Sequence, residues 1–239
     1  MATAGQVSLW AATRPGAALT PLRSRFSDAY ELDGGLEIVV FSAQSELEAA
    51  LQRLRAAAEA AAAAGAGRSE VYSTAPARHS KAPMVGIDVE WRPDFRPGSN
   101  NPVALVQLAA DGLCVLVRTC CLGFPAALRA FLSDRRLCFV GLNWSVNDER
   151  KMASSFGWQT SDFGSFVDLA RLAASSSVAH GLGARPGLAA LADIVLGLSV
   201  PKNKQITLSD WAGHSLSSEQ IKYAALDAAL VWHIACRLG

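Results

Sequence analysis

Two acidic residues, Asp88 and Glu90, stand two positions apart in an otherwise apolar stretch of the chain. Side chains alternate between the two faces of a β-strand, so both carboxylates share one face, while Val85, Ile87 and Val89 share the other. Two carboxylates held this close disfavour joint ionisation unless a cation, a basic partner or water compensates them. The pair therefore predicts either a site for a hard divalent cation or an edge strand whose acids face water.

A tyrosine and an acid are paired near the end of the chain, where Tyr223 precedes Asp227 by four positions. Ser217 and Gln220 form a capping box that starts a helix there. Residues four apart on a helix lie on the same face, one turn from each other. A tyrosine hydroxyl beside a carboxylate is able to hold a metal-bound water or to orient a phosphate. The alternative is a tyrosine packed on the core with an exposed aspartate.

A further acid, Asp148, falls in the first turn of a predicted helix that follows a buried strand at 137–142 and a glycine turn. Ser145 lies three positions before it, which resembles a capping box. Helix capping is therefore a competing role for this carboxylate.

The order of these motifs along the chain resembles that of the DEDD superfamily of 3′–5′ exonucleases, in its tyrosine-containing branch. The motifs of that superfamily map here onto Asp88 and Glu90, Asp148, and Tyr223 with Asp227. The sister branch has a histidine five positions before the last aspartate, where this chain has Lys222. The resemblance covers about residues 37–239 and is closest to the Werner-type exonuclease domain and its stand-alone plant relatives, then to RNase D.

One feature departs from the family pattern, because the segment from Gly141 to Asp148 is a residue longer than the pattern has. Either the residues between them loop out, or the helix begins later than Ser145. The neighbouring acid Glu149 would face another direction on the helix.

The resemblance implies an RNase H-like fold, in which a mixed β-sheet is flanked by helices. It implies a 3′–5′ exonuclease that hydrolyses terminal phosphodiester bonds at the 3′ end of DNA or RNA and releases nucleoside monophosphates. Two Mg²⁺ or Mn²⁺ ions would be held by four carboxylates, namely Asp88, Glu90, Asp148 and Asp227. In this scheme Asp88 bridges both ions, and Tyr223 orients the attacking water.

Three further residues are candidate contacts to the nucleic acid. Lys202 and Lys204 precede the final helix and are placed to contact phosphates, although most surface lysines serve solubility. Trp91 follows the acidic pair and either stacks on the terminal base or belongs to the core. Asp168 and Asp210 are interpreted as helix caps or hydrogen-bond acceptors.

Two other functions are weighed against the exonuclease. A catalytically weak or inactive nucleic-acid-binding module of the same fold is the main alternative, and the longer second motif is its only support. A nucleotide-binding Rossmann protein is disfavoured because no GxGxxG motif joins a strand to a helix.

The elements that must position these residues follow from hydrophobic periodicity and turn residues, which predict an α/β domain with a mixed sheet. Residues 37–239 are expected to form the exonuclease domain, and residues 1–36 an N-terminal extension that is partly flexible, with little structure over residues 1–27. A strand at 36–41 follows a turn. The other expected elements are a helix at 45–64, a loop at 65–82, strands at 84–91, 103–109, 114–117 and 137–142, and helices at 124–132, 145–156, 188–196 and 217–238.

Composition sets limits on partners and compartment. The 239-residue chain is 51% hydrophobic with a net charge of +1, so binding of nucleic acid requires a local patch or bound metal rather than overall charge. No run of apolar residues is long enough for a membrane span.

Five cysteines without metal-binding spacing predict free thiols in a reducing interior, nucleus or cytoplasm. The first 27 residues contain arginines and no acid, which weakly resembles organelle targeting. The sequence does not decide between a monomer and a homo-oligomer.

Overall fold

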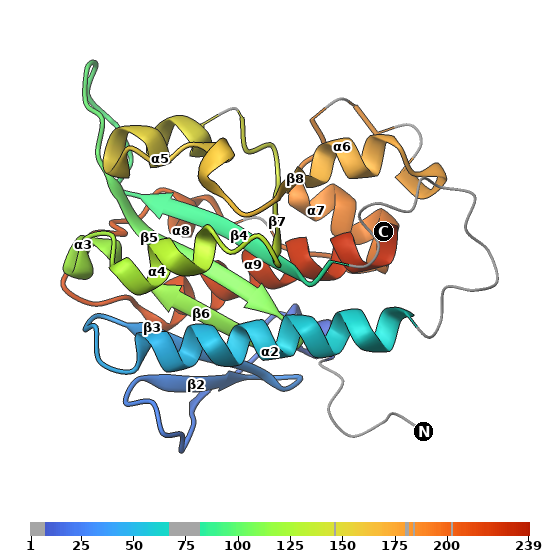
Figure 1. Cartoon of the computed structure of the whole chain (residues 1–239), viewed down its shortest axis with the longest axis horizontal. Coiled ribbons are helices and arrows are strands. Elements are labelled where there is room, and N and C mark those ends of the chain that lie inside the picture. The colour runs from blue at the N-terminus through green and yellow to red at the C-terminus, as the bar shows by residue number, and fades with distance from the viewer. Residues whose placement is uncertain (1–7, 67–81, 146, 180–181, 184, 202) are drawn as a thin grey trace.

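A single mixed β-sheet of eight strands with helices on both faces forms the body of the protein in the computed structural model (Figure 1). The structure describes residues 8–66, 82–145, 147–179, 182–183, 185–201 and 203–239. The strands are β1 (Leu19–Pro21), β2 (Ala29–Leu32), β3 (Leu36–Phe41), β4 (Met84–Trp91), β5 (Val103–Ala110), β6 (Leu113–Val117), β7 (Cys138–Gly141) and β8 (Phe166–Asp168). Their order is β1-β2-β3-β6-β5-β4-β7-β8.

Strand directions follow from the lengths of the connections. Tight turns join β2 to β3 and β5 to β6, and each of these pairs is antiparallel, as is the pair of β4 and β5. The turn between β5 and β6 has Asp111 and Gly112 at positive φ. Strand β7 pairs parallel with β4 on one side and with β8 on the other, and a helix lies between β7 and β8 in the chain. The predicted α/β class with a mixed sheet is confirmed.

The two sheet faces are covered by different helices (Figure 1). Helices α2 (Leu47–Ala66) and α4 (Ala126–Leu132) pack over one face, where Val85, Ile87 and Val89 of β4 are buried. Helix α9 (Ser218–Leu238) packs over the other, with alanines at its contact surface. Because side chains alternate along β4, Asp88 and Glu90 point toward the face that α9 covers.

The remaining helices are short. They are α1 (Leu9–Ala12), α3 (Thr119–Leu122), α5 (Asp148–Phe156), α6 (Leu169–Ala174), α7 (Leu188–Leu191), which continues as a π-helical turn to Leu196, and α8 (Lys204–Thr207). The capping box of Ser217 and Gln220 starts α9 as predicted. The predicted loop at 65–82 lies largely outside the described residues. Within the described part of the chain, no helix combines the length and apolarity that crossing a bilayer requires.

The helix expected at 145–156 begins three residues later, at Asp148, and Ser145 forms no capping box. Asn143 takes a left-handed backbone conformation with φ of 53°, which interrupts the approach to the helix. Trp144 then turns inward and is buried against Phe163 and Phe166. Of the two alternatives for this segment, the later start of the helix is therefore observed.

The N-terminal part is more ordered than the sequence predicted. Little structure was expected over residues 1–27, but residues 9–12 form α1 and residues 19–21 form β1. Strand β1 pairs with β2, so the sheet continues across the boundary expected between residues 36 and 37. Ala12 and Ala17 contribute to the core beneath α9.

Helix α9 approaches the backbone of β4 closely at Gly86. A Cβ atom built there would meet the Ala228 carbonyl oxygen and would lie 2.9 Å from the Trp232 backbone nitrogen. A glycine at this point therefore lets the helix lie directly against the strand, two residues before Asp88.

We expect Gly86→Ala to destabilise the protein by about 1–3 kcal/mol, because the added methyl group must displace helix backbone. Gly65→Ala is the matched control, since a Cβ atom there has nothing within 4 Å and lies in α2. That change should stabilise by up to about 1 kcal/mol. Chemical denaturation of both variants measures the difference, and equal stabilities would contradict the close approach of α9 to β4.

Candidate active site

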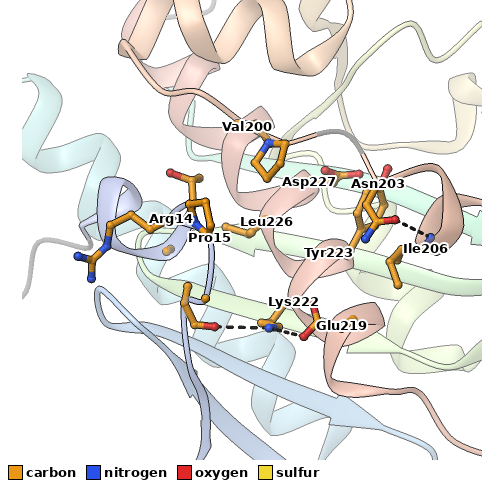
Figure 2. Close-up of a pocket in the computed structure, with 15 residues that line it drawn as sticks. Arg14, Pro15, Val200, Asn203, Ile206, Glu219, Lys222, Tyr223, Leu226 and Asp227 are labelled. Carbon is orange, nitrogen blue, oxygen red and sulfur yellow. Dashed lines mark hydrogen bonds and ion pairs between the residues drawn. The ribbon is translucent and has the colours of Figure 1, made fainter.

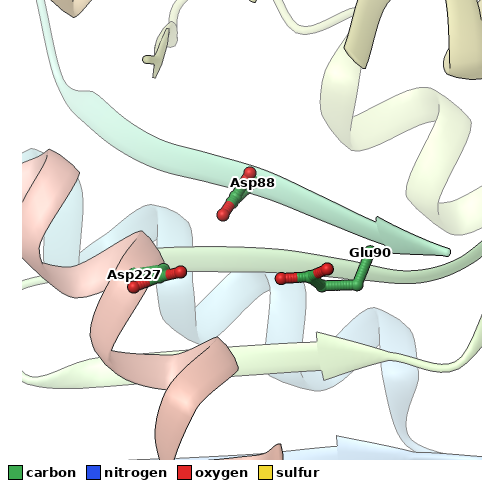
Figure 3. A group of neighbouring side chains, drawn as sticks. All are labelled: Asp88, Glu90 and Asp227. Carbon is green, nitrogen blue, oxygen red and sulfur yellow. The ribbon is translucent and has the colours of Figure 1, made fainter. Parts of the chain in front are cut away.

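Three carboxylates that are far apart in sequence converge between β4 and α9. Each of Asp88, Glu90 and Asp227 offers an oxygen, and these oxygens all lie within 4.8 Å of one another. Figure 3 shows the three side chains pointing toward a common centre, two from the strand and one from the helix. Of the two alternatives for the Asp88 and Glu90 pair, the edge strand facing water is wrong, because β4 lies inside the sheet between β5 and β7.

The electrostatics of this cluster disfavour joint ionisation. Burial raises the pKa of Asp88 to about 6, although the backbone amide of Val89 donates to its Oδ1 at 2.9 Å. Burial and the charges of its acidic neighbours raise the pKa of Glu90 well above its ordinary value. Burial, followed by the charge of Asp88, does the same for Asp227. Among the described residues, no lysine, arginine or histidine forms an ion pair with these acids.

Asp148 lies at the edge of this cluster, outside the group of three. It is the first residue of α5, and burial, followed by the charge of Asp88, raises its pKa to about 8. Its negative charge also contributes to the raised pKa of Glu90. The rival Glu149 accepts a hydrogen bond from Thr160 Oγ1 at 2.6 Å. Asp148 is thus the acid of this segment that interacts electrostatically with the cluster.

Tyr223 lies one turn before Asp227 on α9, and its hydroxyl is 3.2 Å from Thr207 Oγ1 at the end of α8. Burial and the nearby charge of Asp227 raise its pKa, so the phenol is protonated at neutral pH. Its ring also packs at 46° against buried Trp211. A hydroxyl fixed by Thr207 beside an acid is arranged to donate or accept a hydrogen bond.

Two hollows meet at Tyr223 and Asp227. One, of about 170 Å³, is walled by residues 12–17 of the N-terminal segment, by the segment around Asn203 and by α9 (Figure 2). The other, of about 260 Å³, is lined by Leu188, Ala189, Lys204 and Thr207 among others. The predicted contact Lys204 therefore borders a hollow beside the acids. The other predicted lysine, Lys202, lies outside the described residues.

The N-terminal wall of the first hollow is attached to α9. The Lys222 ammonium group lies 2.5 Å from a carboxylate oxygen of Glu219, and it donates to the carbonyl oxygen of Ala17 at 3.4 Å. Lys222 occupies the position at which the sister branch has a histidine. Here its ammonium group supports the wall of the hollow.

Two acids that were interpreted as hydrogen-bond acceptors have that role. Asp168 caps α6 through Ala170 and accepts from the backbone amides of Asn143 and Trp144, at 3.1 and 3.0 Å. It thereby fixes the turn that precedes Asp148. Asp210 accepts from the backbone amide of Ala212.

Trp91 is partly buried against the core, and the Lys151 ammonium lies 5.2 Å from the centre of its ring. Of the two roles predicted for this tryptophan, the contacts favour core packing. Lys151, which the sequence did not single out, is almost fully buried at 1% exposure.

Gln107 of β5 is a buried polar residue that the sequence also did not single out. It stands directly across the strand pair from Asp88 and is fully buried. Neither its amide nitrogen nor its amide oxygen has a hydrogen-bond partner among the described residues. Directly opposed side chains have Cβ atoms about 5 Å apart, so an unpaired amide borders the carboxylate cluster.

Gln107→Leu is expected to raise the free energy of unfolding of the metal-free protein by about 1–3 kcal/mol, because it removes a buried amide without partners. Gln52→Leu on exposed α2 is the control, and it should change stability by less than about 0.5 kcal/mol. Denaturant titration in the presence of a chelator measures both. Destabilisation by Gln107→Leu would show that the amide is paired.

The comparisons with known proteins agree with this geometry. The model of a family described as 3′–5′ exonuclease matches residues 69–239, which is most of the chain. The chain therefore belongs to the 3′–5′ exonuclease family, and the resemblance to the DEDD superfamily is confirmed. The matched residues include all five side chains of the predicted motifs and exclude the N-terminal wall.

Among curated relatives, a 3′–5′ exonuclease of Arabidopsis thaliana is 32% identical over 153 residues, which are 63% of this chain and 51% of the relative. The mouse bifunctional 3′–5′ exonuclease/ATP-dependent helicase WRN is 29% identical over 63% of this chain and 10% of its own length. Human exonuclease 3′–5′ domain-containing protein 2 is 32% identical over 62% of this chain and 24% of its own. The chain thus matches about half or less of each relative.

Solved structures show the same fold. The exonuclease domain of Aedes aegypti Nibbler superposes with a TM-score of 0.62 at 21% identity, covering 84% of this chain and 86% of that one. Escherichia coli RNase D superposes with a TM-score of 0.60 at 18% identity, covering 83% of this chain and 43% of that one. The predicted RNase H-like fold is confirmed.

Proposed function

We propose that this protein is a metal-dependent 3′–5′ exonuclease that hydrolyses the terminal phosphodiester bond of DNA or RNA and releases nucleoside monophosphates. The observation that carries the proposal is the convergence of Asp88, Glu90 and Asp227, with oxygens within 4.8 Å of one another and no ion pair to a base among the described residues. All three carboxylates of such a cluster are ionised together at neutral pH only when a cation compensates them.

The donor set supports a hard divalent cation. Carboxylate oxygens suit Mg²⁺ or Mn²⁺, whereas a zinc site would be expected to include histidine or cysteine. We assign Asp88, Glu90 and Asp227 to one ion, and Asp88 with Asp148 to a second. The unpaired amide of Gln107 borders the same site, which supports the presence of a further polar partner there.

The two ions would lower the pKa of a bound water and stabilise the charge that develops on the leaving 3′ oxygen. The residues of the chain position the reactants. Tyr223, protonated and fixed by Thr207, would orient the attacking water or the phosphate by a hydrogen bond. The two hollows beside Tyr223 and Asp227 would accept the nucleosides on either side of the bond being cleaved, with Lys204 near the phosphate.

The net charge supports a role of the cations in binding nucleic acid, and the cysteines support a reducing compartment. The net charge of +1 gives no general attraction to nucleic acid, so the cations would supply much of it. All five cysteines are free thiols, and Cys114 and Cys138 are buried, which supports a reducing compartment such as the nucleus or cytoplasm.

The test is a panel of single- and double-stranded DNA and RNA, each labelled at one end and incubated with Mg²⁺ or Mn²⁺. With a 5′ label, the products should shorten stepwise, and with a 3′ label, labelled mononucleotide should appear at once. EDTA should abolish both results. A shift in the electrophoretic mobility of the labelled nucleic acid without shortening would instead support the inactive binding module. Fragments cut at internal positions would contradict exonucleolytic cleavage.

A further inference from the structure

The loop between β4 and β5, residues 92–102, leaves the strand immediately after Glu90 and Trp91 and projects beyond the sheet next to α5 (Figure 1). It presents Phe95 with 74% of its surface exposed, more than any other large apolar side chain among the described residues. Proteins bury most large aromatic side chains, because each buries a substantial apolar area. The ring is exposed on the loop that follows β4, the strand that carries Asp88 and Glu90, and it is therefore available to stack on a base.

The loop is held firmly from one side by Lys151 of α5. Its ammonium group lies 2.5 Å from Asp94 Oδ2, and it donates to Asn100 Oδ1 at 3.0 Å and to the carbonyl oxygen of Asn101 at 2.8 Å. The same group lies over the ring of Trp91. A buried charge with this many partners orders the backbone on both arms of the loop.

A second attachment holds the loop from the side of α8 and α9. Both carboxylate oxygens of Asp210 accept hydrogen bonds from the Arg92 guanidinium, with a distance of 2.8 Å from Nε to Oδ1. Within the loop, Asn101 also donates to Asp94 Oδ1 at 2.7 Å and to the carbonyl oxygen of Pro93 at 3.1 Å. The exposure of Phe95 is thus a fixed feature of an ordered loop.

Exposed arginines lie on the loop and on the neighbouring helix α5. Arg96 directly follows Phe95 and is exposed, and exposed Arg150 on α5 lies close enough to Asp94 to lower the pKa of that carboxyl, after the larger effect of Lys151. Asp94 is already paired with Lys151, so these two guanidinium groups keep their charge available to anions. An exposed ring on a loop that also presents an arginine offers the two contacts by which proteins bind single strands, which are stacking on bases and attraction of phosphates.

We propose that Phe95, together with Arg96 and Arg150, binds the single-stranded part of the nucleic acid a few nucleotides before the 3′ end. The inference rests on the proposed exonuclease function. Phe95 follows Glu90 by five positions, so their Cα atoms lie at most about 18 Å apart. A stacked strand advances about 3.4 Å per nucleotide, so about five nucleotides at most lie between the two points.

The test compares two substrates, a single-stranded oligonucleotide of a dozen nucleotides and the p-nitrophenyl ester of thymidine 5′-monophosphate. The ester has a cleavable phosphodiester but no strand to bind. We expect Phe95→Ala to lower the ratio of kcat/KM on the oligonucleotide to kcat/KM on the ester by about 5-fold to about 150-fold, chiefly through KM, which is the effect of losing one base stack. Phe95→Trp should restore the ratio, and Arg96→Gln should lower it more at low salt than at high salt.

Val178→Ala is the control for an exposed apolar side chain, and Arg23→Gln is the control for an exposed arginine, which follows the edge strand β1. Equal ratios for Phe95→Ala and Val178→Ala would overturn the proposal. Absence of hydrolysis of both substrates by the unmodified protein would instead overturn the proposed function. Lys151→Met should lower Tm by several degrees and lower the ratio as Phe95→Ala does. A ratio unaffected by Lys151→Met would show that the attachment of the loop does not serve binding.

Discussion

Asp227→Asn is expected to lower kcat on a labelled oligonucleotide by at least about 10³-fold while making the metal-free protein more stable. The loss of rate follows because the change removes one of three carboxylates that we propose share a cation, and a bound cation would supply several kcal/mol of transition-state stabilisation. Initial rates at saturating substrate measure this loss.

The expected gain in stability of the metal-free Asp227→Asn variant has an electrostatic cause. Burial and the charge of Asp88 raise the pKa of Asp227, so ionisation of this carboxyl opposes folding when no cation is bound. Asparagine has nearly the same shape and carries no charge. Thermal unfolding in EDTA at pH 8 should therefore give a higher Tm for Asp227→Asn than for the unmodified protein.

The matched control is Asp193→Asn, which removes an acid exposed at the start of the π-helical turn after α7. It should leave both the rate and the metal-free Tm close to their original values. If Asp227→Asn lost activity and also lost stability in EDTA, the carboxylate would be serving a structural role in place of binding a cation.

The metal-free protein is expected to lose stability as the pH rises from about 4 to about 8, and Mg²⁺ is expected to restore it. Burial raises the pKa of Asp88 to about 6 and that of Asp148 to about 8, both above the ordinary value of 3.8. Between the ordinary and the raised pKa, the folded protein holds protons that the unfolded chain has released. The free energy of unfolding therefore falls with pH, by about 1.4 kcal/mol per pH unit for each such proton.

The measurement is urea denaturation across this pH range, with EDTA and with Mg²⁺. Carboxyl groups with a lowered pKa, such as Asp134, stabilise the protein less as the pH falls, and this opposes the effect of the cluster. The free energies of unfolding of the Asp88→Asn variant are therefore subtracted from those of the unmodified protein at each pH, which leaves the contribution of the cluster. Since binding of the cation requires ionised carboxylates, Mg²⁺ should stabilise more at pH 8 than at pH 6. A metal-free stability that rises steadily with pH and does not depend on Asp88 would contradict the raised pKa values.

Local pattern was enough to predict most of the elements. The strand from Met84 to Trp91 has the predicted bounds, because its alternating and turn-flanked sequence fits no helix. The start of α9 follows from the Ser217 capping box. The late start of α5 could not be derived locally, since it depends on the burial of Trp144 against residues that lie about twenty positions further along the chain.

Contacts between distant segments also limited prediction of the site. Asp88 and Glu90 were found because their residue types and spacing suit metal binding, whereas Asp227 was added through the resemblance of the motif order to the DEDD superfamily. Gln107 lies in an apolar run, and only the strand register places its amide beside Asp88. Likewise, the pairing of Lys151 with Asp94 joins residues of ordinary surface type across 57 positions of sequence.

The most direct test of the proposed metal site is anomalous X-ray diffraction from crystals of the protein soaked in Mn²⁺ and a nucleoside monophosphate. We predict one anomalous peak among the carboxylate oxygens of Asp88, Glu90 and Asp227, and a second between Asp88 and Asp148, with neither present in crystals of the Asp88→Asn variant. Absence of any peak at these carboxylates under saturating Mn²⁺ would contradict the proposal that they hold catalytic metal.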